Sequence, residues 1–292
     1  DDSGNKSVRP LGERSGQRKR SLSRLAALPY LQGSRPLPAR RNVVKFNEQS
    51  AYPGLNFYLS GHAPRAYLTD MEGTLLHQWG LDFEEVWPGP VRFPENEDYT
   101  RFWRRAYFYP DGDLLTIFDG IGLIKIDKDS NLIWSYRGGC HHDLQLDEEG
   151  SIYVLTHRVL DSHDRIDIEG GILEEFITIL NPEGDEVKSV SLLESFFNSD
   201  YAPLLETMGK TGNVFHANTL EIMDGETAGK VPFFKEGHIL VSVRNIHTIA
   251  VIDPEGETVT WALTGKWLFQ HQPTVLENGN LLLFDNLGER KK

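Results

Sequence analysis

FQHQPTVLENGNLLLFDN, residues 269–286, consists of two short apolar runs joined by Asn278-Gly279. An Asn-Gly pair between apolar runs is a strong hairpin signal, because both central residues of a type I′ turn need positive φ. We therefore predict two antiparallel strands in this stretch. The hairpin would bring His271, eight residues before the turn glycine, beside Asn286, seven residues after it.

The same spacing of polar residues around a turn glycine recurs upstream. In each copy one polar residue opens the first strand and another stands seven residues after the glycine, so both are expected at the end of the hairpin opposite the turn. The pairs are Arg104 and Asp119 around Gly112, His142 and His157 around Gly150, and His216 and Arg244 around Gly237, where an inserted loop precedes the glycine.

A second kind of hairpin alternates with the first. It combines an apolar strand, an acidic turn and a strand with an aromatic or branched residue, and its copies begin at Tyr67, Ile124, Ile179 and Val251. Two alternating hairpin types, at roughly 40 to 70 residues per pair, are typical of four-stranded β-propeller blades. The prediction is an all-β propeller. A β-sandwich, the competing fold, would not require two alternating hairpin types.

Composition limits the remaining choices. A chain of 292 residues can bury the core of one large all-β domain or two smaller ones. No apolar run has the length needed to span a bilayer, and the single Cys140 excludes an internal disulfide framework and a multi-cysteine metal site. The sequence starts at Asp1 without methionine, which leaves open a signal peptide or anchor removed upstream.

Charge divides the chain into two parts. Residues 1–41 hold ten Lys or Arg against three acids, whereas the remainder is strongly acidic. We expect residues 1–45 to form a basic flexible N-terminal segment, which would bring the protein near a membrane, and residues 46–292 to form the propeller. Helical spacing of apolar residues predicts a helical insertion near 190–210. The acidic body argues against nucleic-acid binding by the folded domain.

Candidate site residues follow from the propeller geometry. Inner strands of successive blades surround one channel, so His142, His216, Arg244 and His271 are expected to face one another. Such a cluster suits a small tetrahedral anion, because arginine offers a planar fork of donors and imidazole is a donor or a nucleophile according to its protonation. His141 is an alternative to its neighbour. The shared eight-residue distance to the turn glycine favours His142.

Two other polar groupings have weaker functional signals. Residues 127–131 have calcium-loop spacing, but they occupy the acidic turn of a second-type hairpin and lack the later glutamate, so a plain turn is predicted. The spacing of His157, Asp161 and His163 fits no tight metal site. We therefore predict no metal, and His157 is expected to stand behind His142.

These motifs together resemble the bacterial arylsulfate sulfotransferases, over about residues 100–286. The matching segments, in the same order, are His142-Asp143, residues 216–219, residues 241–244, Gln270-His271, Gly279-Asn280 and residues 284–286. The family has a six-bladed propeller, so the resemblance implies a chain that is incomplete at its C-terminus. The chain departs from the family pattern at Gln272, where many members carry Asp.

The resemblance implies sulfuryl transfer from an aryl sulfate ester to a phenolic acceptor, with neither a nucleotide donor nor a cofactor. His271 would attack sulfur and hold the group as a sulfohistidine. The resemblance also assigns roles to the remaining site residues. His142, His216 and Arg244 would bind the sulfuryl oxygens, one of the histidines would exchange the phenol proton, and Asn218, His141 and Asn286 would contact the substrate.

Location and partners also follow only from the resemblance. It implies a periplasmic or otherwise exported protein, with a membrane anchor as one option, and it leaves a homodimer open. The alternative from another class is a non-catalytic β-propeller that binds a partner or glycan on its channel face. Hydrolysis of the sulfate is a third reading, with water in place of the phenol.

Overall fold

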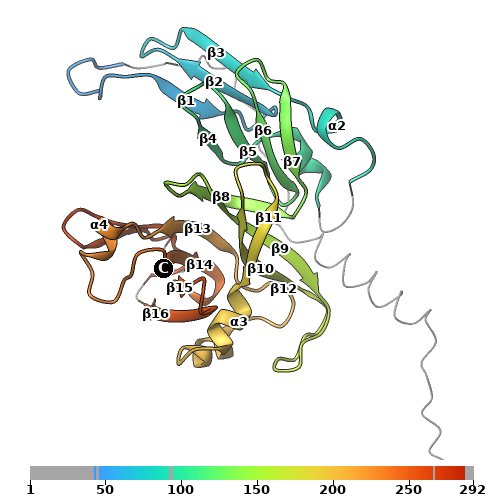
Figure 1. Ribbon diagram of the computed structural model, residues 1–292, viewed down its shortest axis with the longest axis vertical. Coiled ribbons are helices and arrows are strands. Elements are labelled where there is room, and N and C mark those ends of the chain that lie inside the picture. The colour runs from blue at the N-terminus through green and yellow to red at the C-terminus, as the bar shows by residue number, and fades with distance from the viewer. Residues whose placement is uncertain (1–42, 44–45, 92–94, 266, 287–292) are drawn as a thin grey trace, which may run out of the picture.

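The computed structural model describes residues 43, 46–91, 95–265 and 267–286. Within these residues the strands form five sheets in chain order, and three of the sheets have four antiparallel strands in sequential order. Figure 1 shows the sheets following one another from the blue and cyan β1–β3 at the top to the orange β13–β16 at the lower left. The predicted four-stranded blades are therefore confirmed.

The strand bounds are as follows. The first sheet holds β1 (Asn56–Leu59), β2 (Arg65–Thr69) and β3 (Leu75–Gly80); the second β4 (Ala106–Phe108), β5 (Leu114–Phe118), β6 (Gly122–Ile126) and β7 (Leu132–Tyr136); the third β8 (Cys140–Leu146), β9 (Ile152–Leu160), β10 (Ile172–Leu180) and β11 (Glu186–Ser191), with β12 (Gly212–Asn213) on β10; the fourth β13 (Ala217–Ile222), β14 (Ile239–Val243), β15 (Thr248–Asp253) and β16 (Thr258–Thr264); the fifth β17 (His271–Val275) and β18 (Leu281–Phe284).

Short helical segments connect the strands. They are α2 (Phe83–Val86), η2 (Glu97–Arg101), α3 (Leu192–Phe197), η3 (Ala202–Thr207), α4 (Gly225–Ala228) and η4 (Arg244–Ile246). Among the residues described here, no helix has the length and apolar character needed to cross a membrane. The predicted basic segment, residues 1–45, lies outside the described residues except for Val43.

Apolar side chains fill the spaces between neighbouring sheets. The alternating pattern of the strands turns branched residues of one sheet toward those of the next, which buries them completely and fixes the order of the blades. Representative fully or almost fully buried pairs are Trp79 with Phe118 between the first and second sheets, Ile117 with Val154 between the second and third, and Ile177 with Val241 between the third and fourth.

Side chains of one inner strand bind the backbone of the next inner strand. The inner edge of β13 pairs with no strand among the described residues, so its N–H groups need other acceptors. Oδ2 of Asp143 accepts from Leu220 N at 3.2 Å, and Oε1 of Gln145 accepts from Ile222 N at 2.7 Å. These contacts hold β8 against β13 at the channel end of the blades.

The same device joins β13 to β17. Oγ1 of Thr219 accepts from Gln272 N at 3.0 Å, and both carboxylate oxygens of Glu221 lie 3.4 Å from Val275 N. In both joints the two acceptors are side chains two residues apart on the earlier strand, and the donors are backbone N–H groups of the later strand.

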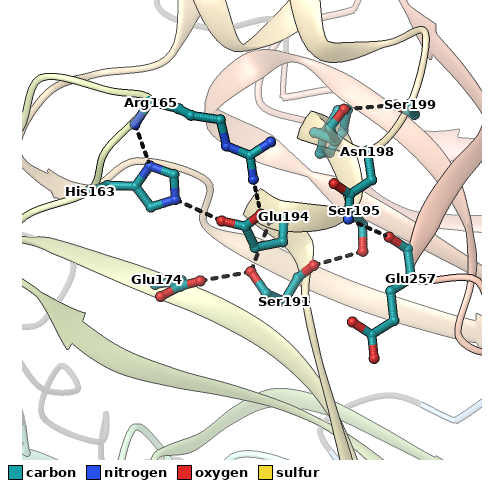
Figure 2. Close-up of polar contacts among 10 residues, drawn as sticks. His163, Arg165, Glu174, Ser191, Glu194, Ser195, Asn198, Ser199 and Glu257 are labelled. Carbon is teal, nitrogen blue, oxygen red and sulfur yellow. Dashed lines mark hydrogen bonds and ion pairs between the residues drawn. The ribbon is translucent and has the colours of Figure 1, made fainter.

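The helix α3 covers the outer side of the third and fourth sheets. Ser191 caps its N-terminus, with Oγ accepting from Glu194 N at 3.1 Å. Figure 2 shows that Glu194 also contacts the loop between β9 and β10. Its carboxylate pairs with Arg165 and lies 2.7 Å from Nε2 of His163. His163 thus has a carboxylate partner. No group of three metal-ligating side chains occurs among the described residues.

Candidate active site

A β-bulge turns His142 toward its neighbouring blade. In the β8–β9 ladder His141 pairs with Leu155 and Leu144 with Val154, so His142 and the residue after it are extra on β8. Consecutive strand residues normally point to opposite faces. The φ of His142 is +53°, which breaks this alternation and brings its ring centroid 4.7 Å from that of His216.

His141 lies behind His142 rather than in its place. Only 3% of His141 is exposed, and its ring stacks on that of His157 at 5.1 Å between centroids. Its Nδ1 lies 2.9 Å from Nδ1 of His142, so one imidazole donates and the other accepts. The two histidines are therefore a connected pair, and His142, which the spacing favoured, is the one that faces His216.

Asn213 of β12 fixes the orientation of His216. Its Oδ1 accepts from the backbone N–H of His216 at 2.7 Å, and its Nδ2 lies 3.3 Å from the ring Nδ1. An amide nitrogen only donates, so Nδ1 of His216 is the acceptor and the ring proton is on Nε2. His216 thereby offers a donor to a bound anion.

His271 opens β17, and its ring is half-buried, with its centroid 6.5 Å from that of His216. Its Nδ1 lies 3.0 Å from the carbonyl oxygen of Phe269. With a proton on Nδ1 this contact is a hydrogen bond and Nε2 holds a lone pair, whereas the contact of 3.1 Å between the same Nδ1 and Nδ2 of Asn286 calls for the opposite tautomer. Nδ2 of Asn286 donates to the same carbonyl at 2.9 Å and lies 3.1 Å from the ring, as the hairpin spacing predicts.

The backbone before His271 is held by buried amides. Gln270 is completely buried, and its Nε2 donates to the carbonyls of Thr248 at 2.8 Å and Val243 at 3.2 Å. The backbone carbonyl of Gln270 accepts from Nδ2 of Asn218 at 3.0 Å. Asn218, expected to contact the substrate, binds the chain beside His271 in this structure.

Two arginines flank the imidazoles. Arg244 follows β14, its guanidinium lies 4.4 Å from the ring centroid of Phe269, and its Nη1 donates to Asn245 at 2.7 Å. Arg104 lies on the wall of the cavity beside His142. The sequence analysis did not place Arg104 among the site residues, although its position eight residues before Gly112 matches that of His142 and His271 in their hairpins.

A cavity of about 170 Å³ opens beside His142 and His216. A cavity of this size has room for a small anion. Its walls include Tyr99, Arg104, Asp119, His142, His157 and His216. The cavity thus brings together five of the eight polar residues that the four hairpin copies place at the ends of their strands, whereas Arg244, His271 and Asn286 are not among its lining residues.

The family profile described as Arylsulfotransferase (ASST) matches residues 106–292, which is more than half of the chain. The chain belongs to the arylsulfotransferase family. The matched residues include the three histidines of the cluster and Arg244, whereas Arg104 lies two residues before the matched region. No curated protein matches the chain.

Solved structures with a similar fold are β-propellers of low sequence identity. They include the WD40 propeller of Doa1 (TM-score 0.47, 11% identity, 80% of this chain and 58% of that chain), the Cps50 (Swd1) propeller of Myceliophteria thermophila (0.46, 12%, 79% and 59%) and BamB of Moraxella catarrhalis (0.43, 9%, 79% and 55%). This arylsulfotransferase chain thus spans less than three fifths of each of these chains. The propeller assignment rests on its own sheets.

The histidines of the candidate site are neutral at pH 7, because the pKa of each is lowered from its usual value. Burial lowers the pKa of His142 and His216 well below the usual range, and the nearby arginines and imidazoles lower both pKa values further. Burial also lowers the pKa of His271, with Arg244 and Arg104 adding to the effect and the Phe269 carbonyl opposing it. Positive charge in the site therefore comes from the two guanidinium groups.

Burial raises the pKa values of the acidic side chains in the site, whereas it lowers those of the histidines. Burial raises the pKa of Asp119, and the Arg104 charge offsets only part of this effect. Burial raises the pKa of Glu175 to about 8, against hydrogen bonds that lower it. Glu175 on β10 is 1% exposed and lies behind His141. A carboxyl group that stays protonated at neutral pH thus stands beside the histidine pair.

Proposed function

We propose that this arylsulfotransferase moves a sulfuryl group from an aryl sulfate ester to a phenol, with His271 as the nucleophile. The observation that carries the proposal is the hydrogen-bond distance of 3.0 Å between Nδ1 of His271 and the Phe269 carbonyl. The proposal adopts the tautomer that donates from Nδ1 to this carbonyl, because the neutral imidazole then has its lone pair on Nε2, and a nucleophile needs this lone pair at neutral pH.

In the first half-reaction, Nε2 of His271 forms a bond to sulfur while the bond between sulfur and the aryl oxygen breaks. The electron pair of the broken bond leaves with the aryl oxygen, which takes a proton from His142. The Nε2–H of His216 and the guanidinium groups of Arg104 and Arg244 stabilise the sulfuryl oxygens as charge moves between them.

In the second half-reaction the acceptor phenol returns a proton to His142. Its oxygen attacks the sulfur of the sulfohistidine, the nitrogen–sulfur bond breaks, and Nε2 of His271 regains its lone pair. Division of one displacement into two lowers each barrier, and a neutral imidazole is both a good nucleophile and a good leaving group. The aryl sulfate and the phenol are the proposed small-molecule partners.

The test incubates the full chain with 4-nitrophenyl sulfate and a phenolic acceptor, and measures 4-nitrophenol release and the sulfated acceptor. His271→Ala is expected to abolish both signals, whereas the matched control His77→Ala, in the first sheet, keeps them. Mass spectrometry of the protein quenched without acceptor should show one SO₃ group on the peptide that contains residue 271.

Undiminished transfer by His271→Ala, or an SO₃ group on another residue, would contradict the assignment of the nucleophile. Equal phenol release with and without the acceptor would indicate hydrolysis. A wild-type chain that binds aryl sulfates but never releases phenol would favour a binding module.

A further inference from the structure

Two buried polar atoms face each other without a hydrogen-bond partner among the described residues. They are Nε2 of His141 and Oε1 of Glu175, and the distance between them is 3.9 Å. Buried polar atoms in native proteins almost always have a partner. A movement of about 1 Å would join these two atoms in one hydrogen bond.

The other ends of both side chains are fixed. Oε2 of Glu175 accepts from the backbone N–H of Ala217 at 2.5 Å, which leaves Oε1 turned toward the imidazole. Nδ1 of His141 lies 2.9 Å from Nδ1 of His142, whose ring faces His216. Glu175, His141 and His142 therefore follow one another as a chain of neighbouring side chains from the interior of the blade to the site.

We propose that Glu175 and His141 form a proton relay that acts through His142 during sulfuryl transfer. The inference rests on the proposed function and extends it to residues that never touch the substrate. At the start Glu175 is protonated at Oε1, His141 carries its proton on Nδ1, and His142 carries its proton on Nε2.

The relay moves three protons in one direction. His142 gives its Nε2 proton to the departing aryl oxygen and takes the Nδ1 proton of His141. His141 in turn takes the proton of Glu175 at Nε2. The products are a neutral phenol, two neutral imidazoles and a Glu175 carboxylate, so the negative charge of the leaving oxygen ends on Glu175. Attack by the acceptor phenol runs the same transfers backwards and restores Glu175.

The surroundings of His142 explain why a relay is needed. Burial and the guanidinium groups of Arg104 and Arg244 make a protonated, cationic His142 unfavourable, as the direction of its pKa shift shows. A neutral His142 that gave away its single proton without replacement would become an imidazolate, which is far more basic than a phenolate. Simultaneous delivery of a proton to Nδ1 avoids both charged forms.

Glu175 suits the far end of this line. Its pKa of about 8 lies close to neutral pH, so the carboxyl group can release and regain a proton without a large free-energy cost in either direction. The groups around it do not supply a permanent charge. His157 pairs with it across the β9–β10 ladder and has a pKa lowered to about 4, and the side chain of Asn213 is a neutral hydrogen-bond donor.

The experiment compares aryl sulfates whose leaving groups differ in basicity. 4-Nitrophenolate leaves readily without a proton, whereas phenolate does not. Glu175→Gln keeps the size of the side chain and an acceptor for the Ala217 N–H, but it cannot relay a proton. We expect it to lower kcat with phenyl sulfate by about 100-fold, a usual effect of losing general acid catalysis, and to leave kcat with 4-nitrophenyl sulfate nearly unchanged.

Two further variants complete the design. Glu174→Gln, the neighbouring strand position whose Oε1 binds Ser191, is the matched control and should behave as wild type with both substrates. His141→Gln should show the same dependence on the leaving group as Glu175→Gln, and the double variant should lose little more than either single variant, because both interrupt one relay.

The relay fails if Glu175→Gln and His141→Gln lower kcat equally with both substrates, or leave the rates with phenyl sulfate unchanged. A purely structural role predicts the first of these results. Both outcomes still require a wild-type enzyme that transfers the sulfuryl group through His271. Absence of transfer in the wild type instead overturns the proposed function, so the two failures are distinguishable.

Discussion

Protonation of Glu175 in the folded protein predicts that stability falls as the pH rises through neutrality. The pKa of this carboxyl is about 8 in the fold against 4.5 for an ordinary glutamate. Between these values the folded state holds a proton that the unfolded state has released, so each pH unit lowers the free energy of unfolding by about 1.4 kcal/mol. The total loss from pH 4.5 to pH 8 is about 5 kcal/mol, and it stops above pH 8.

Other buried groups titrate in the same range, so the test must compare variants. The pKa values of Asp143 and Glu221 are raised to about 6 and about 7, and they add losses of the same sign. His157 has the opposite effect. Its pKa is lowered to about 4 in the fold, so the unfolded state binds its proton more readily and the free energy of unfolding rises with pH in this range. The difference between wild type and Glu175→Gln removes these contributions.

The assay is urea unfolding followed by tryptophan fluorescence at intervals from pH 4.5 to pH 9. Relative to wild type, Glu175→Gln should gain stability steadily as the pH rises and should level off above pH 8. Glu174→Gln should track the wild type over the whole range. Parallel curves for wild type and Glu175→Gln would show that Glu175 is ionised in the folded protein, which would refute the reasoning.

Two predictions concern the reaction itself. Because the nucleophile must be neutral and burial lowers the pKa of His271 below its usual 6.5, kcat/KM for transfer should fall on acidification only below that pH; a profile that rises on acidification would contradict a neutral His271. Arg244→Lys loses the planar fork and the contact with the Phe269 ring, so kcat/KM should fall by about 100-fold at an unchanged urea midpoint, whereas an unchanged kcat/KM would exclude Arg244 from the site.

Local patterns predict the blades well, because their information lies in neighbouring residues. The apolar runs around Asn278-Gly279 specify β17 and β18, and the alternation of hairpins specifies the four-stranded sheets. The predicted type I′ turn is wrong, because Gly279 has a positive φ but Asn278 does not, and Gly279 N donates to the Leu276 carbonyl at 2.8 Å. The same repetition brings His142, His216 and His271 together, since equivalent positions in successive hairpins meet at one end of the inner strands.

Features that depend on contacts between blades could not be predicted from spacing. The choice between His141 and His142 depends on a bulge and a positive φ, which the distance to the turn glycine does not reveal. Glu174 and Glu175 are indistinguishable in sequence, yet only the latter is covered by β8 and β13. Gln270 belongs to one of the sequence motifs, but the motif does not predict that its side chain is buried. That burial follows from the packing of β14 against β17.

In the hydrogen bonds that link β8 to β13 and β13 to β17, a side chain of the earlier strand accepts from a backbone N–H of the later strand. Each inner strand therefore needs the side chains of the inner strand before it. A whole blade is the smallest unit that can be deleted or duplicated without leaving one of these backbone N–H groups unpaired. A circular permutant whose new termini fall in a loop between two blades should thus keep every such bond. A cut inside β13 would disrupt its hydrogen bonds to both β8 and β17.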